Sequence, residues 1–120
     1  MTVNNHIEEV DIITLKQAEK ELELLDCDPE SIAIMAPKAL FHTIRLNNVL
    51  MQDAIIIKQH MLSLGGEAAI SRQAYHLKES SAPMIVMGTH HQLDRLIEKL
   101  SSQYPRLKQI ANDLNGFLQK

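Results

Sequence analysis

Apolar residues recur three or four positions apart in several stretches of the chain, which is typical of amphipathic helices. The pattern predicts helices at residues 15–25, 50–64, 93–100 and 107–118. Thr14 with Gln17, and Thr89 with Gln92, have the spacing of a capping box, so two of these helices have a defined start. Gly65-Gly66 follows the second helix and supplies a residue that readily adopts the left-handed conformation at a helix end.

Short apolar runs between these helices predict strands, at residues 10–13, 32–35, 41–46, 67–70 and 84–87. We expect Asp28-Pro29 to separate the first helix from the next element, Pro37 to end the second strand and Asn47-Asn48 to form a turn. Because helices alternate with strands, we expect one α/β domain over residues 1–120, with residues 1–6 as a candidate disordered terminus. Its sheet should be mixed or mainly parallel, with four to five strands covered by three to four helices.

Composition narrows the class of protein. The 120 residues carry a formal net charge of −3 and only 3% aromatic residues, which disfavours a nucleic-acid partner. The chain has no apolar run near the roughly 20 residues of a membrane span, and its N-terminus lacks the pattern of a secretory signal. Cys27 is the single cysteine and has no partner for an internal disulfide. We therefore expect a cytoplasmic protein without a membrane partner.

The residues that could carry catalysis or bind a metal do not form a recognisable set. Six histidines are present, but His90 and His91 are adjacent and would point about 100° apart on a helix. His42, His60 and His76 lack a second ligand at metal-binding spacing. No nucleophile motif is present, and we expect no catalytic residue, no metal site and no cofactor.

Four residues are candidates for binding a ligand: Lys38, Lys58, Gly88 and Thr89. Gly88-Thr89 joins a buried strand to a helix N-terminus, which favours an anion, but the same pair is also explained as a tight turn with Thr89 as the cap. Lys38 directly follows Pro37, and the sequence identifies no partner for its amine. Lys58 lies among apolar residues, where it can extend its amine to water, pair with an acidic group or bind a ligand carboxylate.

The helix at 50–64 is apolar over much of its circumference, so it is either enclosed in the core or partly covered by a partner. Met51, Ile55 and Ile56 are the candidate interface residues, and Ile56 lies off the main apolar stripe. The alternative for the methionines is a core role, because their flexible side chains fill irregular gaps.

Several short blocks occur in a characteristic order along the chain. They are Ile34–Ala39, Ile44–Leu46, Leu62–Ala69 and Met87–Thr89, with Lys58-Gln59 and the helix Leu93–Leu100 in matching places. Together they span roughly Ile7 to Gln103. This series resembles the extra N-terminal region that some bacterial dihydropteroate synthases carry ahead of their catalytic barrel. His60 departs from the pattern, in which an acidic residue is expected.

The resemblance implies a role in folate biosynthesis. Dihydropteroate synthase is a transferase that condenses a pterin pyrophosphate with p-aminobenzoate on a (β/α)8 barrel, and such a barrel needs about 250 residues. The matching blocks do not reach the barrel's binding motifs, so no catalytic residue is carried over. We expect an accessory domain, not catalytic by itself, that docks on the pterin-binding barrel or associates with itself. The alternatives are a module that binds a pterin or phosphorylated metabolite at Gly88-Thr89 with Lys38, and a small autonomous enzyme.

Overall fold

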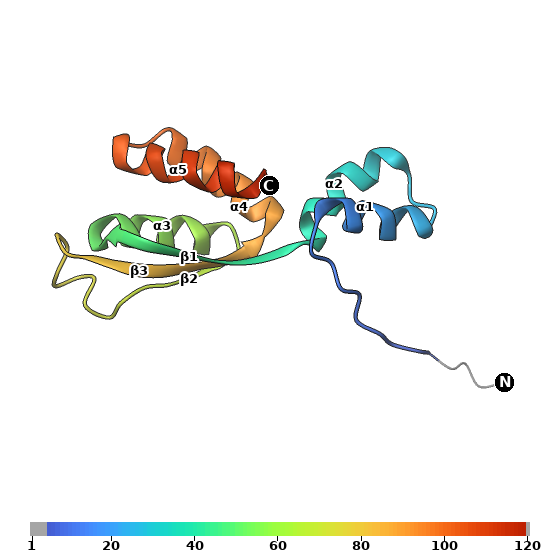
Figure 1. Cartoon of the computed structure of the whole chain (residues 1–120), viewed down its shortest axis with the longest axis horizontal. Coiled ribbons are helices and arrows are strands. Elements are labelled where there is room, and N and C mark those ends of the chain that lie inside the picture. Colours follow the sequence, from blue (N-terminus) through green and yellow to red (C-terminus); the bar gives the residue numbers. More distant parts are fainter. Residues whose placement is uncertain (1–4, 120) are drawn as a thin grey trace.

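The computed structural model describes residues 5–119. Within this range the chain forms five helices and three strands. The order is α1 (Leu15–Leu24), α2 (Pro29–Ala39), β1 (Phe41–Leu50), α3 (Met51–Ser63), β2 (Glu67–Ala69), β3 (Ser81–Thr89), α4 (His90–Ser101) and α5 (Pro105–Leu118). Helices α3, α4 and α5 lie on one face of the sheet, whereas α1 and α2 project from its end (Figure 1).

The sheet differs from the prediction in strand number and direction. Its order is β1-β3-β2, and β3 is antiparallel to both of its neighbours. The expected sheet of four to five strands, mixed or mainly parallel, is therefore wrong, although the α/β class holds. The connection α3 does link two parallel strands, β1 and β2, but β3 lies between them. Alternation of helices and strands along the sequence does not encode which strand is inserted between which neighbours.

Two predicted strands are not strands. Residues 32–35 lie inside α2, where Ile32 and Ala36, one turn apart, are buried. Asp28 caps this helix by accepting a hydrogen bond from the Glu30 amide, and Pro29 occupies its first turn. A four-residue apolar run is compatible with either a strand or a buried helix, and here the cap decides. Residues 10–13 are irregular and extended, outside any strand.

Asn47 and Asn48 form a bulge rather than the predicted turn. The register between β1 and β3 shifts between Leu46 and Val49, so β1 gains one residue and continues to Leu50. Pro83 of the central strand lies opposite this irregularity, between the partners of Leu46 and Val49. A proline cannot donate a ladder hydrogen bond, so the bulge is the place in a central strand where it can be accommodated.

The two predicted capping boxes and the predicted glycine stop are confirmed, whereas α5 begins at Pro105, two residues before the predicted start. Thr14 and Thr89 each accept a hydrogen bond from the amide three residues later, and Gln17 and Gln92 complete both capping boxes. Helix α3 ends before Gly65, whose φ of +89° is the left-handed conformation expected there. Its N-terminus has no side-chain cap; instead, the Ser80 and Lys78 carbonyls accept hydrogen bonds from its first two amides.

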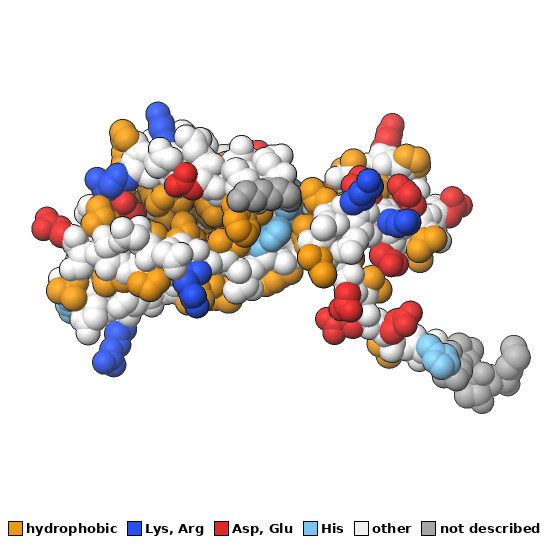
Figure 2. All heavy atoms as spheres, viewed as in Figure 1, with side chains coloured by type: hydrophobic (Ala, Val, Ile, Leu, Met, Phe, Trp, Pro, Cys, Tyr) orange, Lys and Arg blue, Asp and Glu red, His pale blue; other side chains and the backbone are white. Residues whose placement is uncertain are grey.

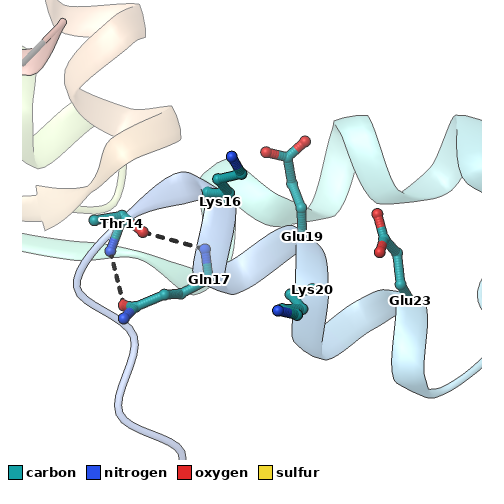
Figure 3. A pocket seen from close by; sticks show the side chains of 6 residues that line it. All are labelled: Thr14, Lys16, Gln17, Glu19, Lys20 and Glu23. Atoms are coloured by element: carbon teal, nitrogen blue, oxygen red, sulfur yellow. Dashed lines mark hydrogen bonds between the residues drawn. The ribbon is translucent and has the colours of Figure 1, made fainter.

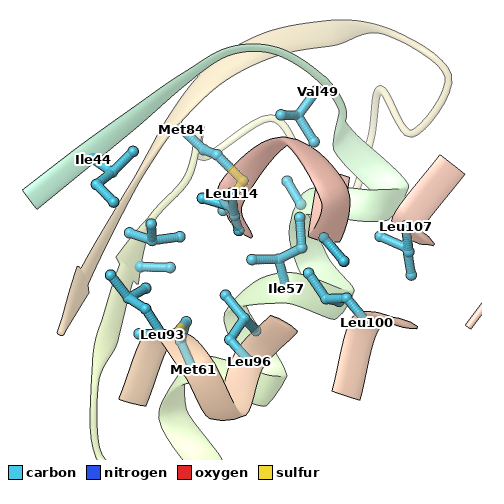
Figure 4. Packing of buried hydrophobic residues seen from close by; sticks show 14 residues of the cluster. Ile44, Val49, Ile57, Met61, Met84, Leu93, Leu96, Leu100, Leu107 and Leu114 are labelled. Carbon is cyan, nitrogen blue, oxygen red and sulfur yellow. The ribbon is translucent and has the colours of Figure 1, made fainter. Parts of the chain in front are cut away.

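The core lies between the sheet and helices α3, α4 and α5 (Figure 4). Alternate residues of β3, among them Met84 and Val86, point toward the helices. They meet Ile57 and Met61 from α3 and the leucines of α4 and α5. The full set of buried apolar residues in this cluster is Ile44, Val49, Ala54, Ile57, Met61, Ala68, Met84, Val86, Leu93, Leu96, Leu100, Leu107, Ala111 and Leu114.

The molecule is elongated because the N-terminal part extends away from this core. Its dimensions are 63 × 30 × 22 Å and its Cα radius of gyration is 17.4 Å, against about 14 Å for a compact chain of this length. Residues 5–13 lead away from α1 as an extended segment, which we call the tail (Figure 1). The prediction that residues 1–6 are disordered falls largely on residues 1–4, which lie outside the described range.

Candidate functional site

A groove runs between strand β1 and helix α5 to the junction with α1. In Figure 2 it is a hollow floored by hydrophobic side chains, with histidine visible at the junction. One part, about 340 Å³, is lined by Ile44, Arg45, Leu46, Asn47, Asn48, Val49, Ile110, Asp113, Leu114 and Phe117. The other part, about 840 Å³, is lined by Ile13, Thr14, Leu15, Lys16, Leu40, His42, His90, Asp94, Phe117, Leu118 and Gln119. Phe117 belongs to both parts, so they adjoin.

Two histidines meet in the larger part of the groove. The Nε2 atom of His42 on β1 lies 3.0 Å from the Nδ1 atom of His90, the first residue of α4. The other ring nitrogen of His90 lies 3.8 Å from an Asp94 carboxylate oxygen. Burial, and then the charge of His90, lower the pKa of His42, while Asp94 opposes this shift. The three side chains form a polar line within a groove that apolar and polar side chains line together.

The contact between His42 and His90 was not predicted from the sequence. His42 and His90 are 48 positions apart and meet because His42 pairs with Gly88 in the sheet register, two residues before α4 begins its first turn. The one local signal was the spacing of His90 and Asp94, four residues apart on a helix, which places them on one face. Within residues 5–119, no three His, Cys, Asp or Glu side chains are grouped so that they could hold a metal ion.

At the Gly88-Thr89 turn, several backbone N–H groups already donate hydrogen bonds within the protein. The Thr89 amide donates to the Gln92 side-chain oxygen, the His90 amide donates to the Leu40 carbonyl, and the Gln92 amide donates to the Thr89 hydroxyl. A Cβ atom at Gly88 would lie 2.9 Å from both Gln92 Oε1 and Met61 Cε, so close packing explains this glycine. Anion binding at the turn stays a prediction, and Lys38 is exposed in the last turn of α2.

Lys58 pairs with an acidic group, one of the three roles open to it from the sequence. Its Nζ atom lies 3.1 Å from Glu67 Oε1 and donates to the Ala68 carbonyl at 2.6 Å. The Ala68 amide, and then Lys58, lower the pKa of Glu67. These bonds fix the start of β2 against α3, which is a structural role. Any contact of Lys58 with a ligand remains untested.

The predicted interface residues have unequal exposure. Met51 is buried at the start of α3, whereas Ile55 and Ile56 are half-buried. Ile56 packs against the core cluster from its margin. Most of the apolar circumference of α3 is therefore used in the core, and the remaining outward residues are Ile55 and Leu62. An interface role for Met51, Ile55 and Ile56 stays a prediction.

A second polar cluster joins α3 to α5. The buried Asp53 carboxylate accepts two hydrogen bonds from Arg106, at 2.8 and 3.1 Å, and one from the Tyr104 hydroxyl. Burial would raise the pKa of Asp53, but these hydrogen bonds outweigh it and lower that pKa. Because Tyr104 and Arg106 already donate hydrogen bonds to both oxygens of Asp53, this cluster has a structural role and is not a candidate binding site.

A depression on α1 is another concave surface with charged walls (Figure 3). Its side chains come from a single helix and its cap: Thr14, Lys16, Gln17, Glu19, Lys20 and Glu23. Thr14 and Gln17 are occupied by the capping box, and the charged side chains point outward (Figure 3). Its side chains belong to one helix and its cap and bring no reactive groups together, so the β1–α5 groove is the stronger candidate site.

Comparison with known proteins relates the chain to part of larger folate-pathway proteins. It is 32% identical over 92 residues to the bifunctional dihydropteroate synthase/dihydropteroate reductase of Helicobacter pylori, a match that covers 75% of this chain and 24% of that protein. It is 32% identical over 113 residues to a probable bifunctional folylpolyglutamate synthase/dihydropteroate synthase of Halobacterium salinarum, covering 92% of this chain and 13% of that protein.

The chain thus spans at most about a quarter of the length of these relatives. No protein-family model matches it, and no solved structure is significantly similar. No helix within residues 5–119 has the length and apolar character to cross a membrane. The similarity agrees with the family resemblance of the short sequence blocks and identifies the chain as related to a region of proteins that contain dihydropteroate synthase.

Proposed function

We propose that this chain is an accessory region of a dihydropteroate synthase system, associated with folate biosynthesis and not catalytic by itself, that docks on the pterin-binding barrel. The observation that carries the proposal is the asymmetry of the matches, which take up 75% and 92% of this chain but 24% and 13% of the relatives. A catalytic barrel needs about 250 residues, so the chain is too small to hold one.

The geometry supports a docking role. The described residues form a small sheet covered by helices on one face, with no (β/α)8 arrangement within residues 5–119. The outward residues of α3, Ile55 and Leu62, are seven positions apart and therefore share one face of the helix. Two apolar side chains in line on the outward face of a helix suit contact with a partner protein.

The test is binding of the 120-residue chain to the dihydropteroate synthase barrel of the same organism, measured by sedimentation velocity. We expect a complex with the unaltered chain and a loss of at least tenfold in affinity for the double variant Ile55→Asp, Leu62→Asp. The matched control is Leu24→Asp, which places the same charge on exposed α1. The absence of any complex, or equal binding by both variants, would contradict the proposal.

A second candidate function is favoured by the position of the His42–His90 pair. It lies in a groove of about 840 Å³ beside the Gly88-Thr89 turn, where a pterin or a phosphorylated metabolite would find both apolar walls and ring nitrogens. Calorimetric titration with phosphorylated pterins should give saturable heat that His42→Ala abolishes. Lys38→Ala tests the basic residue expected from the sequence. Flat titrations across such compounds would remove this candidate.

A further inference from the structure

The larger part of the groove lies where helix α1 meets the rest of the molecule. Its lining residues come from the start of α1, from β1, from the start of α4 and from the end of α5. A cavity of about 840 Å³ in which separate elements converge is a common setting for a small-ligand site. Among its lining residues, Lys16, His42 and His90 can carry a positive charge and Asp94 is acidic. This excess of cationic groups indicates a ligand with negative charge.

Lys16 supplies the permanent positive charge. It is exposed in the first turn of α1, where Figure 3 labels its side chain. No ion pair formed within residues 5–119 involves Lys16. Its ammonium group is therefore open to an anionic ligand, for which lysine serves as a point charge. Lys38, the basic residue expected from the sequence, is not among the residues that line either part of the groove.

The His42–His90 pair supplies a charge that depends on pH. After the pair takes up one proton, the charged ring can still donate to the neutral one, so the contact of 3.0 Å survives a single protonation. Asp94, 3.8 Å from the other ring nitrogen of His90, favours that proton. With a neutral pair, the charges of Lys16 and Asp94 cancel, whereas a protonated pair leaves the lining with a net positive charge. The lining residues from α5 are not ionisable: Phe117, Leu118 and Gln119.

Apolar side chains line the same cavity. Phe117 is 52% exposed and belongs to both parts of the groove. A planar ring can stack against an aromatic side chain of this kind and bury apolar surface on both partners. The other apolar residues of the lining are Ile13, Leu15, Leu40 and Leu118. A ligand that fits this cavity therefore has a flat apolar body besides its anionic group.

We infer that the larger part of the groove binds an organic oxyanion with a flat apolar body. The oxyanion lies between Lys16 and the His42–His90 pair, the ring stacks on Phe117, and binding takes up one proton on the histidine pair. Because Lys16 belongs to α1 and the other residues belong to β1, α4 and α5, the ligand ties α1 to the rest of the molecule. The inference rests on the second candidate function, which uses the same groove, and adds the residues and the proton that recognition requires.

Proton and anion must strengthen each other's binding. In the free protein, burial and then the charge of His90 lower the pKa of His42, while Asp94 opposes this shift. An anion beside the rings favours their charged form and raises the pKa of the pair. By linkage, the ligand binds more tightly as the pH falls from 8 toward 6, through the ordinary histidine pKa of about 6.5.

Calorimetric titration of the full chain at pH 6 tests the ligand class with phenyl phosphate, inorganic phosphate and phenol as probes. Phenyl phosphate carries both the ring and the oxyanion, so we expect it to bind about tenfold more tightly than either fragment. Lys16→Gln should weaken the binding of phenyl phosphate about fivefold, the upper end for an exposed charge pair, and should leave the binding of phenol unchanged. Lys20→Gln, on the next turn of α1 and outside the lining of this cavity, is the matched control. Equal binding of phenyl phosphate and phenol, or equal effects of the two lysine variants, would overturn the inference.

Benzenesulfonate tests the proton, because its own charge stays constant between pH 5 and pH 8. We expect its affinity to rise about fivefold from pH 8 to pH 6, with a heat of binding that depends on the buffer as uptake of a proton requires. In nuclear magnetic resonance, the imidazole signals of His42 and His90 should titrate at higher pH when the ligand is bound, and those of His91 should not change. Absence of binding, an affinity independent of pH, or equal shifts for all three histidines would overturn the inference.

Variants separate this inference from the second candidate function. The double variant His42→Asn, His90→Asn should bind benzenesulfonate more weakly and without proton uptake, whereas His91→Asn should take up a proton as the unaltered chain does. If phosphorylated pterins bind in a manner that depends on His42, while Lys16→Gln has no effect and no proton is taken up, the inference fails and the second candidate function stands. If neither phosphorylated pterins nor phenyl phosphate bind, both fail. Docking to a barrel is a separate measurement that none of these results affects.

Discussion

The imidazole rings of His42 and His90 meet at an angle of 46°, with His42 Nε2 3.0 Å from His90 Nδ1. One ring must donate and the other accept, so this contact requires at least one neutral histidine. It joins the edge strand β1 to the first turn of α4, where the His90 amide also donates to the Leu40 carbonyl. The junction between the helical pair α1–α2 and the sheet is therefore built around a contact that depends on protonation.

Stability should fall as the pH is lowered through the titration of His42. Burial and His90 lower the pKa of His42 below its ordinary value of 6.5. The unfolded chain therefore takes up the proton first, so the contribution is complete above about pH 6.5 and is lost as the pH falls toward the pKa of the folded state. His42→Asn should reduce this fall in the free energy of unfolding, measured with urea at pH 8, 7, 6 and 5.

His91→Asn is the control for that series, because it alters the neighbouring histidine outside the His42–His90 contact. His60 also has a lowered pKa, through burial and the nearby charge of Lys99. A residual dependence on pH should therefore persist in His42→Asn. Identical pH profiles for His42→Asn and the unaltered protein would contradict the importance of the pair.

The Asp53 cluster should contribute stability that is lost in acid. Asp53 is 2% exposed and depends on Tyr104 and Arg106 for its hydrogen bonds. Asp53→Ala, which removes all three hydrogen bonds, should cost about 3 kcal/mol, and Tyr104→Phe, which removes one hydrogen bond to the charged carboxylate, about 1.5 kcal/mol. Arg106→Ala should cost more than Tyr104→Phe, since it leaves a buried carboxylate without its positive partner.

The pH dependence of this cluster follows from the lowered pKa of Asp53. Its contribution is present above the ordinary value of 3.8 and is lost as the pH falls through the lower pKa of the folded state. Denaturant unfolding between pH 5 and pH 2 should show a flatter profile for Asp53→Ala than for the unaltered chain. An equally steep profile in both would show that other carboxylates dominate acid unfolding.

Substitution of glycines by alanine should distinguish the effect of close packing from the effect of helix propensity. In Gly66→Ala the new Cβ would lie 2.5 Å from Met61 Cε and 2.9 Å from the Met87 carbonyl oxygen, and the backbone cannot move aside easily. We expect a loss of about 1–3 kcal/mol. Gly88→Ala meets only side-chain atoms of Gln92 and Met61 and should cost less.

Gly116→Ala is the matched control within the same chain. Apart from its chain neighbours and the backbone of α5 itself, no described atom lies within 4 Å of a Cβ built at this position. Alanine is the better helix former, so we expect a gain of about 1 kcal/mol. Thermal unfolding followed by circular dichroism ranks all three variants. A loss for Gly116→Ala as large as that for Gly66→Ala would contradict the packing argument.

Truncation of the core should have its largest effect at the centre of α3. Ile57 has no exposed surface and lies between the sheet and helices α4 and α5 (Figure 4). Ile57→Ala should cost about 3 kcal/mol of unfolding free energy, through lost burial and the cavity left behind. The comparison is Ile34→Ala on the exposed side of α2, which should change stability by less than about 0.5 kcal/mol.

Two of the predictions that failed, the strand at residues 32–35 and the turn at Asn47-Asn48, have different causes. The run at residues 32–35 was interpreted as a strand because four apolar residues have no resolvable period. The two asparagines at 47 and 48 suggested a turn, although in the sheet they form a bulge opposite Pro83. For residues 32–35 the deciding signal, Asp28 as a cap and Pro29 in the first turn, was present in the sequence. For Asn47 and Asn48 the missing information was the register of β1 against β3.

The candidate site was only partly accessible from sequence. The sequence predicted that Thr89 caps a helix, and it gave an acidic partner as one of the roles open to Lys58. The structure identifies Gln92 and Glu67 as the partners. The sequence did not predict the His42–His90 pair, because the two residues belong to a strand and a helix that are far apart along the chain.

The sequence by itself determined the starts of α1 and α4 at Thr14 and Thr89 and the end of α3 before Gly65, because capping boxes and left-handed glycines act within about four residues. It also determined that the chain has an aliphatic α/β core. Only the tertiary structure decided the strand order, the antiparallel direction and the meeting of His42 with His90. Each of these depends on contacts between segments tens of residues apart, whose energy is set by the whole packed arrangement rather than by local preference.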